Sequence, residues 1–367
     1  MPTAALHQSH AYRRRAPARH MRELLAVIMC LALCALLISG CARSQAIVET
    51  PAASATDEAA TTRPPTSEPS ATPAPSETPT PPATTAPSAT PAPTATPAPT
   101  AEPLSAAVSL SQPRLAQGSV GVVRVSASRP CEVTASLADR ELGFVRAGEG
   151  QYMALVGIHA LASTESLPLT VEVTAEDGQR LSLATTVEVI SGDYGEEVIH
   201  FDEETGKLLD PAISEPENVL MGKVWETFSP EILWTDAFLW PVEGPFTSYF
   251  GTRRSYDGQI SSYHAGLDID GETGDPVLAA ADGNVVMVEP LQVRGNVVVV
   301  DHGAGVLTGY FHLDSFAVEE GQTVKAGDVI GQMGATGLVT GSHLHWELHV
   351  GGIATDPAEW TEAAPMP

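Results

Sequence analysis

Histidine and aspartate residues recur at short spacings in the carboxyl-terminal third of the chain. His264 precedes Asp268 by four residues, and His343 and His345 are two residues apart. Between these two segments lies His312, within the sequence YFHL. The chain has 4 cysteines and no pair with CxxC spacing, so a metal site would have to be built from His, Asp or Glu. Zinc accepts imidazole nitrogens and carboxylate oxygens readily, so these residue types predict a metal site.

The spacing of these residues decides which side chains share a face of a β-strand. Residues two or four positions apart on a strand point to the same side. His264 would then share a face with Asp268, and His343 would share one with His345. Two imidazoles on one strand face are also compatible with simple solvation. With His264 and Asp268 in the same region, a shared metal ion explains the pair better.

The number of ligands agrees with hydrolytic chemistry. A catalytic zinc site has three protein ligands and one open position for water. His264, Asp268 and one histidine of the pair at 343 and 345 supply that number. Bound zinc lowers the pKa of its water and polarises a scissile carbonyl, and a neutral imidazole can accept the proton. The remaining histidines, among them His312, are then available for proton transfer.

Taken together, the three segments resemble the lysostaphin-type endopeptidases, a family of zinc enzymes that hydrolyse peptidoglycan peptides. The family pattern is HxxxD, then a distal HxH, with another histidine between them. The resemblance covers residues 241–360 and implies that His264, Asp268 and His345 bind zinc. It implies that His312 and His343 are the catalytic histidines. All five positions are kept, and Trp346 stands where the family usually has Phe.

The resemblance implies a function and leaves one alternative open. The expected function is a zinc-dependent endopeptidase that hydrolyses the peptide cross-links of peptidoglycan during cell-wall remodelling or division. The alternative is a weak or inactive wall-binding regulator that activates another cell-wall hydrolase. Glu347 is either a partner that orients a ligand or a surface carboxylate. We expect His349 to lie outside the site and His302 to be structural.

The sequence around these residues predicts β-strands. Residues 241–362 contain short valine-rich runs separated by glycines and show no long helical period, which predicts a compact β domain, of lysostaphin type by the resemblance. Residues 104–190 alternate between apolar and polar side chains in six or seven short runs, which predicts an immunoglobulin-like β-sandwich serving as a spacer or binding module. The fold class expected is therefore all-β.

The segment before the sandwich predicts export and anchoring. Arginines precede an apolar run over residues 24–38, and the run ends in Ile-Ser-Gly before Cys41, which resembles the lipobox of bacterial lipoproteins. Residues 1–41 are therefore expected to be a lipoprotein signal with Cys41 lipidated, the alternative being an uncleaved signal anchor. Residues 42–103 are rich in Pro, Thr, Ser and Ala, which predicts a disordered linker.

The remaining expectations concern the connector and the partners. Residues 191–240 are acidic and aromatic, which predicts a connector that packs on a neighbouring domain, with a short helix over residues 217–227. The formal net charge of −26 disfavours nucleic-acid binding. The resemblance implies peptidoglycan as a partner, and the lipid expected on Cys41 implies the membrane. The expected location is extracytoplasmic, on the membrane and facing the wall.

Overall fold

The computed structural model describes residues 102–200, 206–256 and 259–366. The expected signal segment, Cys41 and nearly all of the expected linker lie outside these residues. Residues 101–367 group together as one compact unit. Within the described residues, no helix has the length and apolar character needed to cross a membrane.

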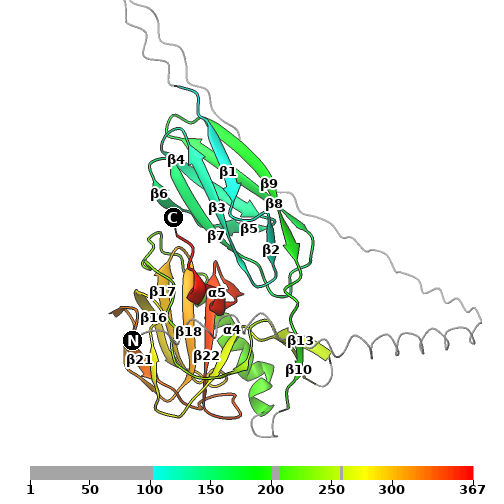
Figure 1. Ribbon diagram of the computed structural model, residues 1–367, viewed down its shortest axis with the longest axis vertical. Coiled ribbons are helices and arrows are strands. Elements are labelled where there is room, and N and C mark those ends of the chain that lie inside the picture. The colour runs from blue at the N-terminus through cyan, green and yellow to red at the C-terminus, as the bar shows by residue number, and fades with distance from the viewer. Residues whose placement is uncertain (1–101, 201–205, 257–258, 367) are drawn as a thin grey trace, which may run out of the picture. The chain divides into compact units, whose positions relative to one another are not determined.

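Residues 106–190 form two antiparallel-rich sheets that face each other across an apolar core (Figure 1). One sheet has the strand order β1-β3-β7-β6, and the other has the order β2-β9-β8-β4-β5. The strands are β1 (Ala106–Leu110), β2 (Arg114–Ala116), β3 (Val120–Ala127), β4 (Cys131–Leu137), β5 (Arg140–Leu142), β6 (Val145–Gly148), β7 (Gln151–Gly157), β8 (Ser166–Ala175) and β9 (Arg180–Ile190).

The two-sheet core follows from the alternation in the sequence. Val123 and Val125 on β3, and Leu169, Val171 and Val173 on β8, are fully buried, while the residues between them face outward or lie nearer the surface. The sequence predicts six or seven strands, and the structure has nine in this region. The additional strands β2, β5 and β6 have only three or four residues, too few to show an alternation.

The connector contains β10 (Glu196–Val198), the 3₁₀ turn η2 (Lys207–Leu209) and helix α4 (Pro211–Trp225). The helix begins six residues earlier than the predicted 217–227 and ends two residues sooner. Asp210 caps its first turn by accepting a hydrogen bond from the Ala212 amide at 2.9 Å, and Pro211 occupies the first helical position. The early turns were not predicted from the sequence, because proline is disfavoured inside a helix and Pro216 lies inside this one.

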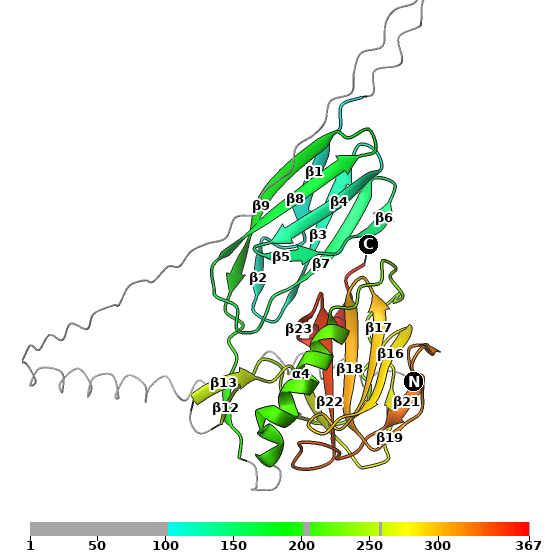
Figure 2. The same ribbon diagram turned by 180° about the vertical axis from the view of Figure 1, so that it is seen from behind.

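The carboxyl-terminal region is built on one eight-stranded sheet, with two three-stranded sheets beside it (Figures 1 and 2). The large sheet has the order β11-β14-β22-β18-β17-β16-β20, with β23 paired to β22. The small sheets have the orders β15-β21-β19 and β10-β12-β13. Helix α4 lies across the large sheet in Figure 2, and its Met221 and Trp225 share an apolar cluster with β17 and β18 residues.

The elements of this region are β11 (Phe246–Ser248), β12 (Arg253–Tyr256), β13 (Gln259–Tyr263), β14 (Gly266–Asp270), β15 (Pro276–Leu278), β16 (Gly283–Pro290), β17 (Asn296–Gly303), β18 (Val306–Leu313), β19 (Ser315–Phe316), β20 (Thr323–Val324), β21 (Val329–Gln332), β22 (His343–Val350), β23 (Ile353–Thr355) and α5 (Pro357–Glu362). Among the described residues, 102–200, 206–256 and 259–366, α4, α5 and the short turn η2 are the helical elements. The expected all-β class is confirmed.

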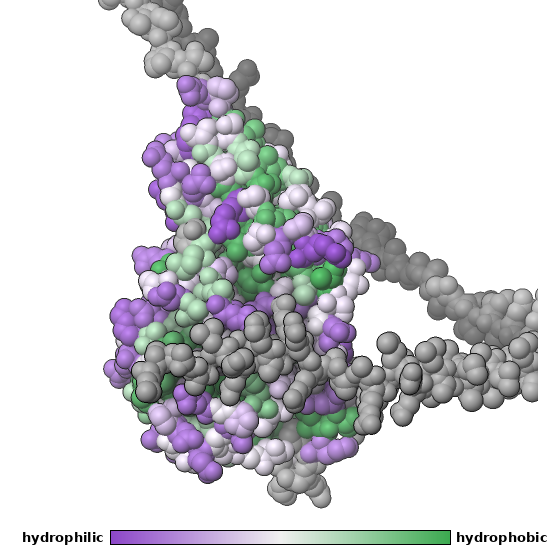
Figure 3. All heavy atoms as spheres, in the orientation of Figure 1, coloured by the Kyte–Doolittle hydropathy of each residue, from purple (hydrophilic) through white to green (hydrophobic). Residues whose placement is uncertain are grey.

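The main core lies on the side of the large sheet opposite the histidines of β22. Leu344 and Trp346 are fully buried, as the alternation with His343 and His345 predicts. This core also includes Met153 and Leu155 of β7, so the sandwich and the large sheet share apolar packing. On the face turned to the viewer, hydrophilic and hydrophobic side chains are interspersed (Figure 3). The buried apolar side chains of the described residues form three clusters.

Candidate metal centre

Two neighbouring strands and a short connection bring the first three predicted residues together. Strands β14 and β22 are antiparallel, and Asp268 and His345 lie directly opposite each other. His264 lies in the two-residue connection between β13 and β14. The expectation that His264 and Asp268 share one strand is therefore wrong. The chain bends after Tyr263, and the bend rather than strand alternation aims His264 at Asp268.

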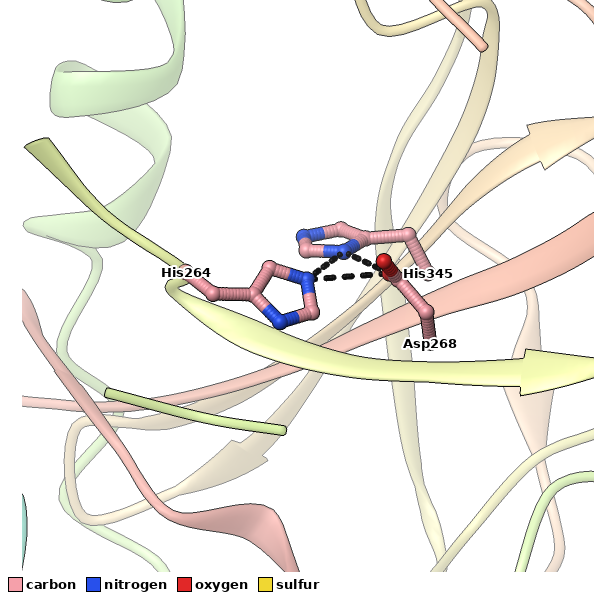
Figure 4. Close-up of side chains that lie close together, drawn as sticks. All are labelled: His264, Asp268 and His345. Atoms are coloured by element: carbon pink, nitrogen blue, oxygen red, sulfur yellow. Dashed lines mark hydrogen bonds and ion pairs between the residues drawn. The ribbon is translucent and has the colours of Figure 1, made fainter. Parts of the chain in front are cut away.

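Three ligand atoms converge at this point (Figure 4). His264 Nε2 is 2.9 Å from Asp268 Oδ1, and His345 Nδ1 is 2.7 Å from the same oxygen. The two nitrogens are 2.9 Å apart. His264 is fully buried, whereas the side chains of Asp268 and His345 are each 13% exposed. The cluster is therefore closed behind His264 and open beside the other two residues.

Hydrogen bonds on the far side of each ring fix which nitrogen faces the cluster. His264 Nδ1 lies 3.0 Å from the Tyr249 carbonyl oxygen, which can only accept, so Nδ1 carries the proton. His345 Nε2 lies 2.9 Å from the Glu347 carboxylate and carries the proton there. When either ring is neutral, the nitrogen that it turns toward Asp268 therefore carries a lone pair. Three converging electron pairs repel one another unless a proton or a cation lies among them, so this donor set fits a bound metal ion.

The electrostatics of the cluster favour the same conclusion. Burial raises the pKa of Asp268, but hydrogen bonds to His264 and His345 outweigh burial and hold this pKa well below its usual range. Burial lowers the pKa of His345, but hydrogen bonds to the Asp268 and Glu347 carboxylates raise it to about 9. Two carboxylates thus attract positive charge to the His345 ring. A metal ion can replace the proton that they would otherwise hold there.

A β-bulge positions His312 at the end of β18. The pairing of β17 with β18 shifts register between Asn296 and Val298, so one residue of β17 faces two of β18. His312 has a left-handed backbone with φ of 61°, which is uncommon for a residue other than glycine. Its Nδ1–H donates to the Thr336 carbonyl at 2.8 Å, which leaves Nε2 as the free nitrogen. The bulge turns this imidazole toward the cluster.

The two predicted catalytic histidines lie beside the cluster and beside each other. The ring centroids of His312 and His343 are 5.1 Å apart, and those of His312 and His345 are 6.0 Å apart. His343 Nε2 is 3.8 Å from Asp268 Oδ1, and its Nδ1–H donates to the Gly341 carbonyl at 3.0 Å. Burial lowers the pKa of His312 to about 3, so this ring is neutral near pH 7. The structure therefore brings all five predicted residues into one site.

Glu347 and His349 extend the site along β22. Glu347 Oε1 accepts from His345 Nε2 at 2.9 Å, and Glu347 Oε2 accepts from His349 Nε2 at 2.7 Å. Of the two alternatives for Glu347, the structure places it as the partner that orients His345. His349 contacts Glu347 and does not belong to the three-atom cluster, so the expectation that it lies outside the site stays a prediction. The alternation of His345, Glu347 and His349 on one strand face was the signal for this chain of contacts.

Arg254, for which the sequence allows either a contact with substrate carboxylates or a structural salt bridge, makes a charged contact on the other side of Asp268. Arg254 Nη2 lies 3.5 Å from Asp268 Oδ2, the oxygen that does not face the two imidazoles. Glu197 of β10 orients this guanidinium through a 2.7 Å bond from Nε to its carboxylate. Ser248 Oγ also accepts from Arg254, at 3.3 Å. Since Glu197 is 71 residues before Asp268 in the sequence, no spacing indicated this contact.

Two other polar residues of the region have structural roles. His302 is fully buried, with Nδ1–H donating to the Asp282 carbonyl at 2.8 Å and Nε2 facing the Thr308 hydroxyl at 2.7 Å. The Asn296 amide donates to the carbonyls of Leu313 and Asp314 and so closes the turn after β18. Neither side chain contacts the cluster through any of these bonds.

Known proteins share both the sequence and the fold of this region. The sequence profile of Peptidase family M23 matches residues 262–357. The peptidoglycan DD-endopeptidase ShyC of Vibrio cholerae is 42% identical over 113 residues, which are 30% of this chain and 26% of ShyC. The murein hydrolase activator NlpD of Escherichia coli is 34% identical over 122 residues, 33% of this chain and 30% of NlpD. The chain thus spans less than a third of the length of these relatives.

A solved structure shares more of the chain. A Pseudomonas aeruginosa protein assigned to peptidase M23, known from its crystal structure, is similar with a TM-score of 0.50 and 27% identity. The match covers 68% of this chain and 96% of that protein, so it extends beyond residues 262–357. The five histidine and aspartate residues of the site all lie within the stretch that the family profile matches. Residues 262–357 of this chain form a Peptidase family M23 domain of the lysostaphin type.

Proposed function

We propose that this protein is a zinc-dependent endopeptidase that hydrolyses the peptide cross-links of bacterial peptidoglycan. The observation that carries the proposal is the convergence of His264 Nε2, Asp268 Oδ1 and His345 Nδ1, all within 4.8 Å of one another. Two histidines with free Nε2 atoms lie beside this cluster. The similarity to a peptidoglycan DD-endopeptidase supports the choice of substrate.

His264, Asp268 and His345 would hold the zinc ion. Bound there, zinc would polarise the scissile carbonyl of the substrate and lower the pKa of a bound water. The chain itself supplies proton transfer at two imidazoles, His312 and His343. His312 is neutral near pH 7 because burial lowers its pKa, so its Nε2 can accept the proton of the attacking water. The partly exposed His343 can donate a proton to the leaving amine.

A second candidate is supported by the similarity to the murein hydrolase activator. A regulator of this kind would bind the wall, or another hydrolase, without cutting peptides itself. A protein that only binds has no need for two unshared lone pairs facing one carboxylate, or for a strained histidine beside them. The complete set of five residues therefore favours the enzyme over the regulator.

The test is digestion of purified peptidoglycan by the zinc-loaded protein, with the soluble products identified by mass. If the protein is an endopeptidase, each product gains one water at a cross-link peptide bond. The rate of product formation should fall to background in His312→Ala. Zinc-loaded protein that releases nothing from the wall, yet stimulates wall cleavage by a separate hydrolase, would support the regulator instead.

We also propose that the protein is exported and held at the membrane by lipid on Cys41, with residues 104–190 as a spacer or wall-binding module. The support is the sequence pattern before Cys41 and the two-sheet fold of residues 106–190. Expression of Cys41→Ala tests the anchor. The variant should leave the membrane fraction, and an unchanged membrane association would show that another segment holds the protein.

A further inference from the structure

We propose that helix α4 is a working part of the metal centre, because its Trp225 positions His349 and Glu347 and thereby the ligand His345. The proposal rests on the zinc site proposed above. Helix α4 ends at Trp225, well before the stretch at 262–357 that the family profile matches. The connector would therefore supply a positioning residue that the catalytic domain alone lacks.

The contacts form an unbroken series from the helix to the cluster. The Trp225 ring stacks on the His349 imidazole, with the ring centroids 3.8 Å apart and an angle of 6° between the planes. His349 Nε2 lies 2.7 Å from Glu347 Oε2, and Glu347 Oε1 lies 2.9 Å from His345 Nε2. His345 Nδ1 then faces Asp268. Trp225 also packs near Phe311, whose ring meets the His345 ring edge to face at 5.3 Å.

The strands beside Glu347 leave space for this arrangement. Glu347 is flanked in register by Gly266 on β14 and Gly309 on β18. A Cβ at Gly309 would come within 2.8 Å of the Trp225 ring, and a Cβ at Gly266 within 3.0 Å of Glu347 Cγ. Neither glycine has a positive φ, so backbone conformation does not require glycine there. A side chain at Gly309 would meet the Phe311 and Trp225 rings, and one at Gly266 would meet the Trp346 backbone carbonyl before it met Glu347.

Each contact in the series has a defined physical task. His345 can present Nδ1 to the cluster only while Nε2–H is held by Glu347. Glu347 is a largely buried carboxylate and is stabilised by donors on both oxygens, of which His349 is one. His349 Nδ1 is buried and has no hydrogen-bond partner among the described residues. The orientation of the His349 ring therefore depends on Glu347 and on the face of Trp225.

A simpler interpretation is that α4 only covers an apolar face of the sheet. Met221, one turn before Trp225, is also buried in this cluster. It serves as the matched control, because it does not belong to the series of ring and hydrogen-bond contacts that leads from Trp225 to His345. If α4 merely covers the sheet, Met221→Ala and Trp225→Leu should act alike. Both would lower the stability of the metal-free protein, and neither would change zinc affinity at a temperature where the protein is folded.

The deciding experiment measures zinc affinity of the full chain by competition with a chromophoric chelator, together with thermal unfolding of the metal-free form. Trp225→Leu and His349→Ala should weaken zinc binding by about 10- to 100-fold, the usual effect of removing an outer partner of a ligand. Trp225→Phe should recover most of the affinity, since it keeps an aromatic face. Met221→Ala should lower the unfolding temperature and leave zinc affinity within about twofold.

Zinc affinity that is unchanged in Trp225→Leu, or that falls in both Trp225→Leu and Met221→Ala in proportion to stability, would overturn the proposal. Wild-type protein that binds no zinc would instead contradict the proposed function, so the two failures are distinguishable. A resonance of His345 Nε2–H that persists in wild type and is lost in His349→Ala would independently support the series of contacts.

Discussion

At the scale of single residues, His312 and His343 differ from the other histidines of the site in where their free nitrogens point. His264 and His345 each place a nitrogen within 2.9 Å of Asp268 Oδ1, whereas His343 Nε2 is 3.8 Å from that oxygen and His312 is not among the three converging groups. The structure thus separates two groups that would hold metal from two that would move protons. The spacing of His343 and His345 did not show which of the two would bind metal. The family resemblance assigned His345 to the metal and His343 to proton transfer.

The first prediction follows from that separation. His312→Ala and His343→Ala should each reduce peptide release from purified peptidoglycan by about 10²- to 10⁴-fold, the usual contribution of a general acid or base. Each should still bind one zinc ion with nearly wild-type affinity, because neither nitrogen belongs to the three-atom cluster. Metal analysis on the same preparations checks this, and loss of zinc in either variant would place that histidine among the ligands.

The second prediction concerns His302, which is buried and neutral. Burial lowers the pKa of His302 to about 4, below the value near 6.5 in an unfolded chain. Between these values the unfolded state binds more protons, so the stability due to this group is complete above pH 6.5 and is lost as pH falls toward 4. Between pH 7 and pH 5 this costs about 2 kcal/mol of the free energy of unfolding.

Urea unfolding of wild type and His302→Gln at pH 7 and pH 5 measures the difference. The variant should be less stable than wild type at pH 7, because the bonds to Asp282 and Thr308 change. The gap should narrow by about 2 kcal/mol at pH 5. A gap that stays constant between the two pH values would mean that His302 titrates alike in the folded and unfolded chain.

At the scale of elements, the sequence predicted the large features and missed the irregular ones. Alternation on β22 correctly put Leu344 and Trp346 in the core, because a strand of eight residues shows its period clearly. The bulge at His312 has no such signature, since it depends on pairing with β17. The contact between Glu197 and Arg254 depends on β10 joining β12, which only the tertiary fold determines. The first turns of α4 were missed because Pro216 interrupts the pattern.

The third prediction tests the packing of α4 on the sheet. Gly309→Ala adds a methyl that would meet the Phe311 and Trp225 rings at 2.6 and 2.8 Å, so we expect overpacking to cost about 1–3 kcal/mol of stability. Gly222→Ala on α4 is the matched control, because no atom lies within 4 Å of an added Cβ there. That variant should gain about 0.5–1 kcal/mol from the better helix propensity of Ala. Chemical denaturation measures both variants, and equal stabilisation by the two would show that Trp225 does not occupy the space beside Gly309.

At the scale of the whole molecule, several regions outside the family match contribute to the site. Glu197 of β10 orients Arg254 beside Asp268, and Trp225 of α4 stacks on His349. The main core also extends into β7 of the sandwich. Between β2 and β3, the Gly118 carbonyl accepts a hydrogen bond from the Asp356 amide of the M23 domain at 2.9 Å.

We propose that zinc held by His264, Asp268 and His345 makes this protein a peptidoglycan hydrolase. Titration of the metal-free protein with zinc, followed by release of soluble peptide from purified peptidoglycan, tests it directly. We expect the release of soluble peptide to rise with added zinc and to stop rising at one ion per chain. We expect no release from His345→Ala at any zinc concentration. Release that is insensitive to zinc and to the substitution, or no release from the fully zinc-loaded wild type, would contradict it.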